Sequence, residues 1–244
     1  NPRDLELELQ LATAQFVDPG YRKEGDVLFK QTINNLFASL RATPGSALSA
    51  GLGEIISDND PRFSLGVVEN YRVLSFDKLK GTVGDRFANG AIEIGIVGDV
   101  DEEAAIAMVG RTFGALPPRE PDFRDYADRR DRPFTKARKR HVLRHNGAKD
   151  QALITMIWPT RDGEDLEQAL QLELLEKIMR IQLTDTLREK LGKAYSPGAS
   201  SNTSRTYRGY GTFSVNASVD IKEVPATRTA ITGTVSALRD APVS

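Results

Sequence analysis

Residues 186–198 (TLREKLGKAYSPG) contain two side chains that could act together on one reacting group. Arg188 lies near the end of an expected amphipathic helix, and Gly192 is placed to end that helix. Tyr195 follows where the chain is expected to turn extended, so the two side chains could converge. A guanidinium and a phenol are both hydrogen-bond donors, which suits an oxygen that gains negative charge in a transition state.

The sequence has no obvious group that would create such an anion. Cysteine is absent, which excludes disulfides, thiolate metal sites and cysteine nucleophiles. The two histidines, His141 and His145, have the i,i+4 spacing of a zinc pair on a helix. Val142 and Leu143 instead indicate an extended segment, in which the two rings lie too far apart to share an ion. We therefore expect exposed strand residues and no metal here, and no G-x-S-x-G motif indicates a serine nucleophile.

Other charged clusters have simpler structural interpretations. Asp99 and Asp101 lie at a strand-to-helix turn, where capping of the helix N-terminus explains them better than cation binding. The basic residues between 129 and 140 alternate with acids and are expected to form a solvated loop. On spacing alone, the simpler interpretation of Arg188 and Tyr195 is an exposed helix arginine and a tyrosine that buries its ring.

Composition excludes several classes of protein. The chain has 244 residues, a formal net charge of −1, and both signs of charge spread along it. A nucleic-acid-binding protein would need a basic face, so no nucleic-acid partner is expected. The longest apolar runs have the length of strands, so no membrane span is expected either. Both ends look cut, which indicates a piece of a longer protein.

The pattern of elements predicts an α+β fold: a two-layer sandwich of a mixed, largely antiparallel sheet with helices on one face. A helical lead-in precedes this domain. The expected strands cover residues 91–97, 152–158 and 211–219. The expected helices cover residues 4–16, 23–40, 46–57, 76–87, 102–113, 164–190 and 223–238.

Several motifs resemble those of the insulinase/pitrilysin family of zinc metallopeptidases, which includes mitochondrial processing peptidase. They occur along the chain in the same order as in the family. Residues 187–196 (LREKLGKAYS) resemble the signature of the family's C-terminal-type domain. The three further segments that agree are residues 92–101 (IEIGIVGDVD), 112–117 (TFGALP) and 209–217 (GYGTFSVNA). The resemblance covers most of the chain from about residue 67, and residues 1–66 resemble the closing helices of a preceding, homologous domain.

The resemblance implies which half of a peptidase this is. Family members consist of four related α+β domains in two halves, and the first half carries an H-x-x-E-H zinc motif with a distant Glu. This chain has no such motif, and residues 27–35 (VLFKQTINN) have no acid where a first-half copy would place a ligand. The chain is thus expected to be the zinc-free C-terminal half. It would comprise the end of one domain (1–66) and a C-terminal-type domain (67–244) that is truncated at its end.

The resemblance also implies roles and partners. Arg188 and Tyr195 would stabilise the carbonyl oxygen of a peptide substrate at a zinc site on the other half, so this chain alone would be inactive. Its partner would be the N-terminal zinc-binding half of the same protein or a separate subunit, and the cofactor of that half would be zinc. The alternative is a catalytically inactive family member that acts as a scaffold or peptide-binding subunit. Bacterial relatives indicate the periplasm, and the cytoplasm stays open.

Overall fold

The computed structural model describes residues 4–190 and 197–241, and for residues 188–190 it describes the backbone alone. Contacts divide the chain into two compact units. Unit 1 contains Asn1–Asn34 and Val67–Tyr126, and unit 2 contains Asn35–Gly66 and Ala127–Ser244. The predicted boundary between residues 66 and 67 concerns homology to a neighbouring domain, and it stays a prediction.

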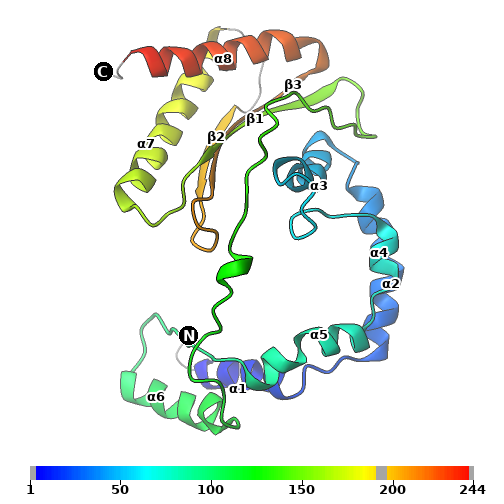
Figure 1. Cartoon of the computed structure of the whole chain (residues 1–244), viewed down its shortest axis with the longest axis vertical. Helices are drawn as coiled ribbons and strands as arrows, with labels where there is room; N and C mark the ends of the chain where they lie inside the picture. The colour runs from blue at the N-terminus through cyan, green and yellow to red at the C-terminus, as the bar shows by residue number, and fades with distance from the viewer. Residues whose placement is uncertain (1–3, 191–196, 242–244) are drawn as a thin grey trace. The chain divides into compact units, whose positions relative to one another are not determined.

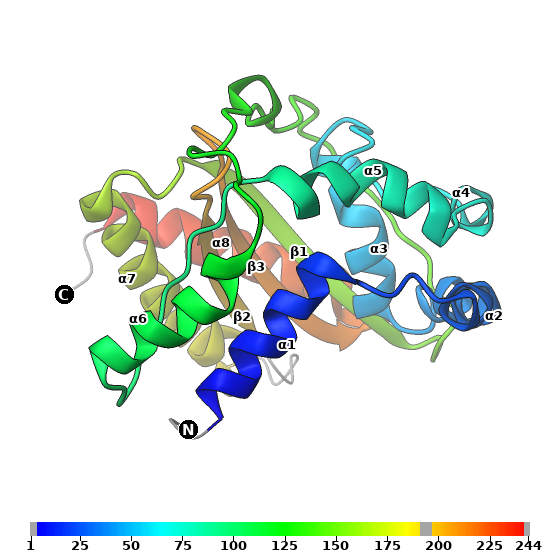
Figure 2. The same ribbon diagram turned by 90° about the horizontal axis from the view of Figure 1, so that it is seen from below.

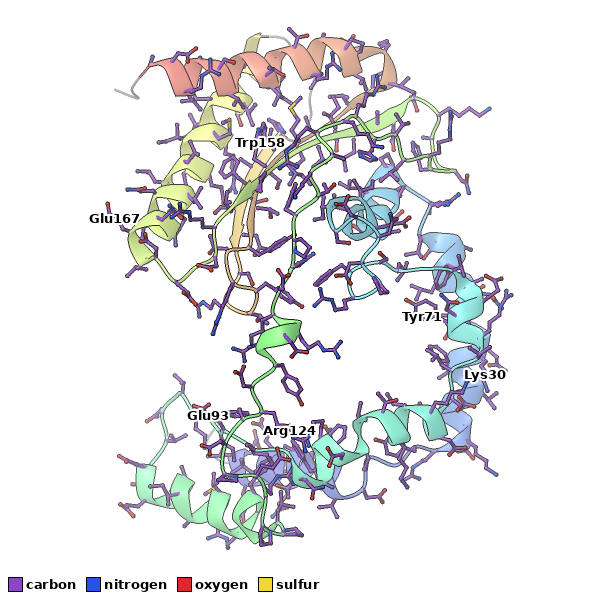
Figure 3. The ribbon with its side chains drawn as sticks, viewed as in Figure 1. Lys30, Tyr71, Glu93, Arg124, Trp158 and Glu167 are labelled. Atoms are coloured by element: carbon purple, nitrogen blue, oxygen red, sulfur yellow. The ribbon has the colours of Figure 1, made fainter. Side chains whose placement is uncertain are left out.

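Unit 2 contains a three-stranded sheet with the order β1-β3-β2. The strands are β1 (Gln151–Thr160), β2 (Gly198–Thr203) and β3 (Gly211–Asp220), and both pairings are antiparallel. Alternate residues of β3 are buried, as expected for a strand with one face on the core. The pairing of Trp158 with Phe213 puts both aromatic side chains on that face; Figure 3 labels Trp158 in β1.

Two helices cover the apolar face of the sheet. They are α7 (Leu166–Leu183), which begins at an Asp165 cap, and α8 (Val224–Asp240). Figure 1 shows both against one side of the strands, with α3 (Pro44–Ile56) on the opposite side. The buried core between the sheet and these helices consists of Met179, Leu183, Leu187, Ala199, Phe213, Val215, Ala217, Val219 and Ile231.

The turn between β2 and β3 is built by side-chain and backbone hydrogen bonds. The hydroxyl of Ser204 accepts from the backbone N–H of Thr206 (3.1 Å) and of Tyr207 (2.7 Å). The N–H of Gly209, which has φ +65°, donates to the carboxylate of Asp162. Glycine is the residue that adopts this positive φ without steric cost, so the turn conformation is set locally.

The regular secondary structure in the described part of unit 1 is helical. It contains α1 (Leu5–Val17), the start of α2 (Lys23–Ser39), α4 (Val68–Arg72), α5 (Phe76–Asn89) and α6 (Glu102–Arg111). Helix α1 contacts both α5 and α6, and Figure 2 shows α1 beside α6. Phe16 of α1 meets Phe87 and Phe113 edge-on, with ring centroids 5.5 and 5.7 Å apart.

Arg119 closes the C-terminal end of α5. Its guanidinium donates to the backbone carbonyls of Arg86, Phe87, Ala88 and Gly90 at 2.7–3.3 Å. These include carbonyls that the last turn of a helix leaves without an intrahelical partner. Local sequence patterns do not reveal this contact, because at least 29 residues separate Arg119 from the carbonyls that it contacts.

The α+β class and the expected helices are confirmed, but one expected strand was wrong and one strand was not expected. Residues 91–97 form no strand, because alternation supplies propensity but no partner, and no strand lies in the described part of unit 1. Residues 198–203 form β2, a strand that was not among those expected from the sequence. Residues 198–203 are extended because they pair with β3, and the residue pattern of this segment alone could not reveal that pairing.

Candidate functional site

The predicted site residues lie at the edge of what the structure describes. The backbone of Arg188 belongs to a π-helical continuation of α7, Thr184–Lys190. Tyr195 lies outside the described residues, and so does the side chain of Arg188. Their convergence on one substrate oxygen therefore stays a prediction, while the elements on either side of them can be described.

Buried leucines anchor the helical side of this segment. Leu183 and Leu187 have no solvent exposure and belong to the core between the helices and the sheet. Their i,i+4 spacing places both on the face of the helix that contacts the sheet. Because Leu187 directly precedes Arg188, its packing fixes the backbone at the start of the predicted site.

A polar clamp, formed by Glu176 and Arg180 of α7, fixes the strand side. The carboxylate of Glu176 accepts from the backbone N–H (2.9 Å) and the hydroxyl (3.2 Å) of Ser201 in β2. Arg180 donates to Glu176 (2.7 Å) and to the carbonyl of Ala199 (3.1 Å). The clamp joins α7 to β2 across residues 191–196. Sequence reasoning missed it, and the i,i+4 Glu–Arg spacing was its only signal.

Gly198 is the first residue of β2, three positions after the predicted site residue Tyr195. It pairs with Asn216 of β3, and a Cβ added to Gly198 would lie 2.9 Å from the Oδ1 of Asn216. A larger residue would have to displace this side chain. The close approach thus fixes the register at which the segment rejoins the sheet.

The histidines do not form a metal site. His145 accepts at Nδ1 from the N–H of Gly147 (3.2 Å), and its Nε2 lies 3.1 Å from the carbonyl of Gln151. A ring that accepts at Nδ1 carries its proton at Nε2, so both nitrogens have backbone partners. His141 is exposed, and neither histidine lies in a strand, contrary to expectation. In the described part of the chain no three acidic, histidine or cysteine side chains form a possible metal cluster, so these residues do not fit a zinc ion.

Asp101 has the predicted structural role. It is the N-cap of α6, and its side chain accepts from the N–H of Ala104 at 2.8 Å. Capping satisfies one of the free N–H groups at the start of the helix. The interpretation of this turn as a helix start is confirmed.

One basic residue of the loop that was predicted to be solvated is partly buried. Arg132 is half-buried, and the carbon of its guanidinium lies over the rings of Phe63 (3.8 Å), Tyr210 (4.3 Å) and Tyr207 (5.4 Å). The expectation of a solvated residue was wrong at this position. These rings come from segments far away in the sequence, so charge patterning could not indicate the contact.

Hydrogen bonds shift the pKa values of two carboxylates beside this loop. The side chain of Arg62 lowers the pKa of Asp60 by donating to both of its carboxylate oxygens. The backbone N–H groups of Gly209 and Glu164 lower the pKa of Asp162 at the β2–β3 turn. Both carboxylates are therefore held ionised by structural partners.

An α+β domain with a helix-to-strand segment bearing Arg188 and Tyr195 is the arrangement that the peptidase resemblance implied. Residues 74–244 match the profile of the peptidase M16 inactive domain, the family of pitrilysin. The chain belongs to the peptidase M16 family, and its matched part is an inactive, C-terminal-type domain. No curated protein is significantly similar to the chain.

Solved structures share the fold at low sequence identity. The peptidase M16 inactive domain from Pseudomonas fluorescens is 18% identical, with a TM-score of 0.77, over 97% of this chain and 57% of that one. Pitrilysin is 14% identical, with a TM-score of 0.62, over all of this chain and 27% of that one. The periplasmic protease PqqL from Escherichia coli is 12% identical, with a TM-score of 0.59, over 100% of this chain and 27% of that one. The chain thus spans about half or less of these proteins' lengths.

Proposed function

We propose that this chain is the zinc-free half of an M16 peptidase and supplies Arg188 and Tyr195 to a peptide site completed by another half. The observation that carries the proposal is the match of residues 74–244 to the inactive domain of this family. The sequence motif at 187–196 lies inside that match. The chain by itself would hydrolyse no peptide.

The local structure supports the role of Arg188. Its backbone lies in a π-helical segment, a feature that is rare in helices and frequent at functional sites. The buried Leu187 and the clamp of Glu176 and Arg180 hold both sides of residues 188–197. A donor whose backbone is anchored in this way would need little reorganisation when negative charge develops on a substrate oxygen.

The partner would be an N-terminal, zinc-binding half, in the same polypeptide or in a second subunit. No cluster of metal-ligating side chains occurs among the residues that the structure describes, and we expect the metal on that half. None of the helices in the described part has the length and apolarity that a bilayer crossing requires. A periplasmic location is proposed by analogy with the periplasmic protease PqqL.

The test is the peptidase activity of the complete protein, or of the complex with its zinc-binding half. We expect Arg188→Ala and Tyr195→Phe each to lower kcat/KM by about 100-fold, because losing one oxyanion donor costs about 3 kcal/mol. The zinc content should stay unchanged. Lys177→Ala is the matched control, since Lys177 is exposed on α7, and it should retain full activity.

Unchanged kcat/KM in both variants would remove the proposed roles. A complete protein whose other half lacks an H-x-x-E-H motif, and which binds peptides without cleaving them, would identify the alternative: a scaffold or peptide-binding subunit.

A further inference from the structure

Three aromatic rings of unit 2 enclose the guanidinium of Arg132. Phe63 and Tyr207 meet edge-on with centroids 5.3 Å apart, and Tyr207 and Tyr210 are also edge-on at 6.3 Å. The guanidinium carbon lies 3.8, 4.3 and 5.4 Å from the centroids of Phe63, Tyr210 and Tyr207. We refer to these three rings as the aromatic cage. Such an arrangement attracts a cation through the negative faces of the rings.

Beyond the three rings, the guanidinium of Arg132 has an electrostatic attraction to the carboxylate of Asp60. The Nε of Arg132 is buried and has no hydrogen-bond partner, and no ion pair or hydrogen bond of its guanidinium occurs among the described residues. The neighbouring Arg62 is different. Its guanidinium donates to Asp60 and to the backbone carbonyls of Arg129 (2.9 Å) and Asp131 (2.8 Å). Arg132 is therefore recognised as a planar cation, without the polar contacts that usually fix a structural arginine.

Each wall of the cage also has backbone hydrogen bonds of its own. Tyr207 and Tyr210 belong to the β2–β3 turn, where the N–H of Tyr210 donates to the carbonyl of Tyr207 at 3.2 Å. The N–H of Phe63 donates to the carbonyl of Asp60 at 3.0 Å. Arg132 comes from a third segment, residues 127–140, whose neighbouring residues 128–131 are exposed. The cage thus resembles a preformed receptor that is filled by a side chain from elsewhere in unit 2.

We propose that the aromatic cage is a binding site for the guanidinium of an arginine side chain in a peptide or protein partner, and that Arg132 closes it in the free chain. A partner arginine would displace the side chain of Arg132 from the cage, while the hydrogen bonds of Arg62 to the carbonyls of Arg129 and Asp131 keep the backbone of this segment in place. A planar guanidinium can stack on these rings, which favours arginine over lysine. The proposal does not depend on the proposed peptidase function.

Self-occupancy predicts weak binding to the wild-type chain. The apparent dissociation constant is the intrinsic value divided by the fraction of molecules with an open cage. Because Arg132 belongs to the same chain and fills the cage, we take the cage to be open in at most about a tenth of wild-type molecules. Removing Arg132 should therefore expose the full intrinsic affinity.

The experiment measures binding of N-acetyl-arginine methylamide to the full chain and to Arg132→Ala by NMR titration of the tyrosine ring signals. We expect Arg132→Ala to bind at least about 10-fold more tightly than the wild type, by the competition above. The citrulline analogue, which is neutral and of equal shape, should not bind. Tyr207→Ala in the Arg132→Ala background should abolish binding.

Matched controls separate the cage from general charge effects. Arg130→Ala removes an exposed arginine two residues away and should leave the wild-type affinity unchanged. Arg132→Gln serves in place of Arg132→Ala should the latter lose its near-UV circular dichroism. Equal affinities of the folded variant and the wild type, or equal binding of the citrulline analogue, would overturn the proposal.

Discussion

Glu176 in α7 accepts two hydrogen bonds from Ser201 in β2, one from the backbone N–H at 2.9 Å and one from the hydroxyl at 3.2 Å. The same carboxylate pairs with Arg180, one helical turn further along. A single acidic side chain thus ties the helix that leads to Arg188 to the strand that follows Tyr195. The side chain of Glu176 is 20% exposed to solvent.

Glu176→Ala should destabilise the fold by about 1.5–3 kcal/mol, because a hydrogen bond to a charged group contributes about that much and a backbone N–H would lose its partner. Chemical denaturation followed by the single tryptophan, Trp158, measures the change. Glu173→Ala is the control. Glu173 pairs with Lys177 in an exposed i,i+4 ion pair, so its loss should cost at most about 0.5 kcal/mol. Equal effects of the two variants would contradict the clamp.

Leu183→Ala should cost about 2–5 kcal/mol, since Leu183 is fully buried and its truncation leaves a cavity in the core. Ile181 lies two residues earlier in the same helix and is 69% exposed. Ile181→Ala should therefore stay within about 0.5 kcal/mol of the wild type in the same denaturation experiment. Comparable losses would mean that α7 packs through a different face.

Gly211→Ala should destabilise the sheet strongly. A Cβ at Gly211 would overlap the carbonyl of Arg161 and lie 2.5 Å from the Oγ1 of Thr160, where backbone leaves no room. We expect a loss of at least about 2 kcal/mol, within the range for overpacked sites. Gly233 lies in α8 with open space around it, and Gly233→Ala should instead stabilise by about 0.5–1 kcal/mol. Thermal unfolding of both variants checks the opposite signs.

The stability of unit 1 should depend on pH through a paired carboxylate, Glu120. Glu120 accepts hydrogen bonds from Arg86 and Arg124, which lower its pKa from 4.5 to about 2. Between these values the unfolded chain binds a proton and the folded chain does not, so stability rises with pH across this window. The contribution is present above pH 4.5 and is lost as the pH falls toward 2.

NMR titration of the carboxyl carbon of Glu120 measures this pKa directly. Glu120→Gln should weaken the dependence of unfolding on pH between 2 and 4.5, with the part due to Asp85 remaining, while Glu103→Gln, at an exposed position of α6, should follow the wild type. A Glu120 pKa near 4.5 in the folded chain would exclude the paired arrangement with Arg86 and Arg124.

Local signals predicted the helices, and non-local contacts decided the rest. Caps such as Asp101 and Asp165 act within one turn, so sequence reveals the helices that they start. Strand β2 exists through its pairing with β3, and residues 91–97 lack a partner despite their alternation. Of the candidate site, the sequence located Arg188 and Tyr195 by motif. It could not indicate that Arg132 meets rings about 70 residues away on either side.

The strand order β1-β3-β2 has a consequence for biosynthesis. The central strand is the last of the three to be synthesised, and residues 161–210 separate it from β1. At about 5–20 residues per second, translation leaves β1 without its neighbour for roughly 3–10 seconds. During that time its Ile154, Met156 and Trp158 have no sheet face to join. The nascent chain would then present a short apolar segment of the kind that ribosome-associated chaperones shield.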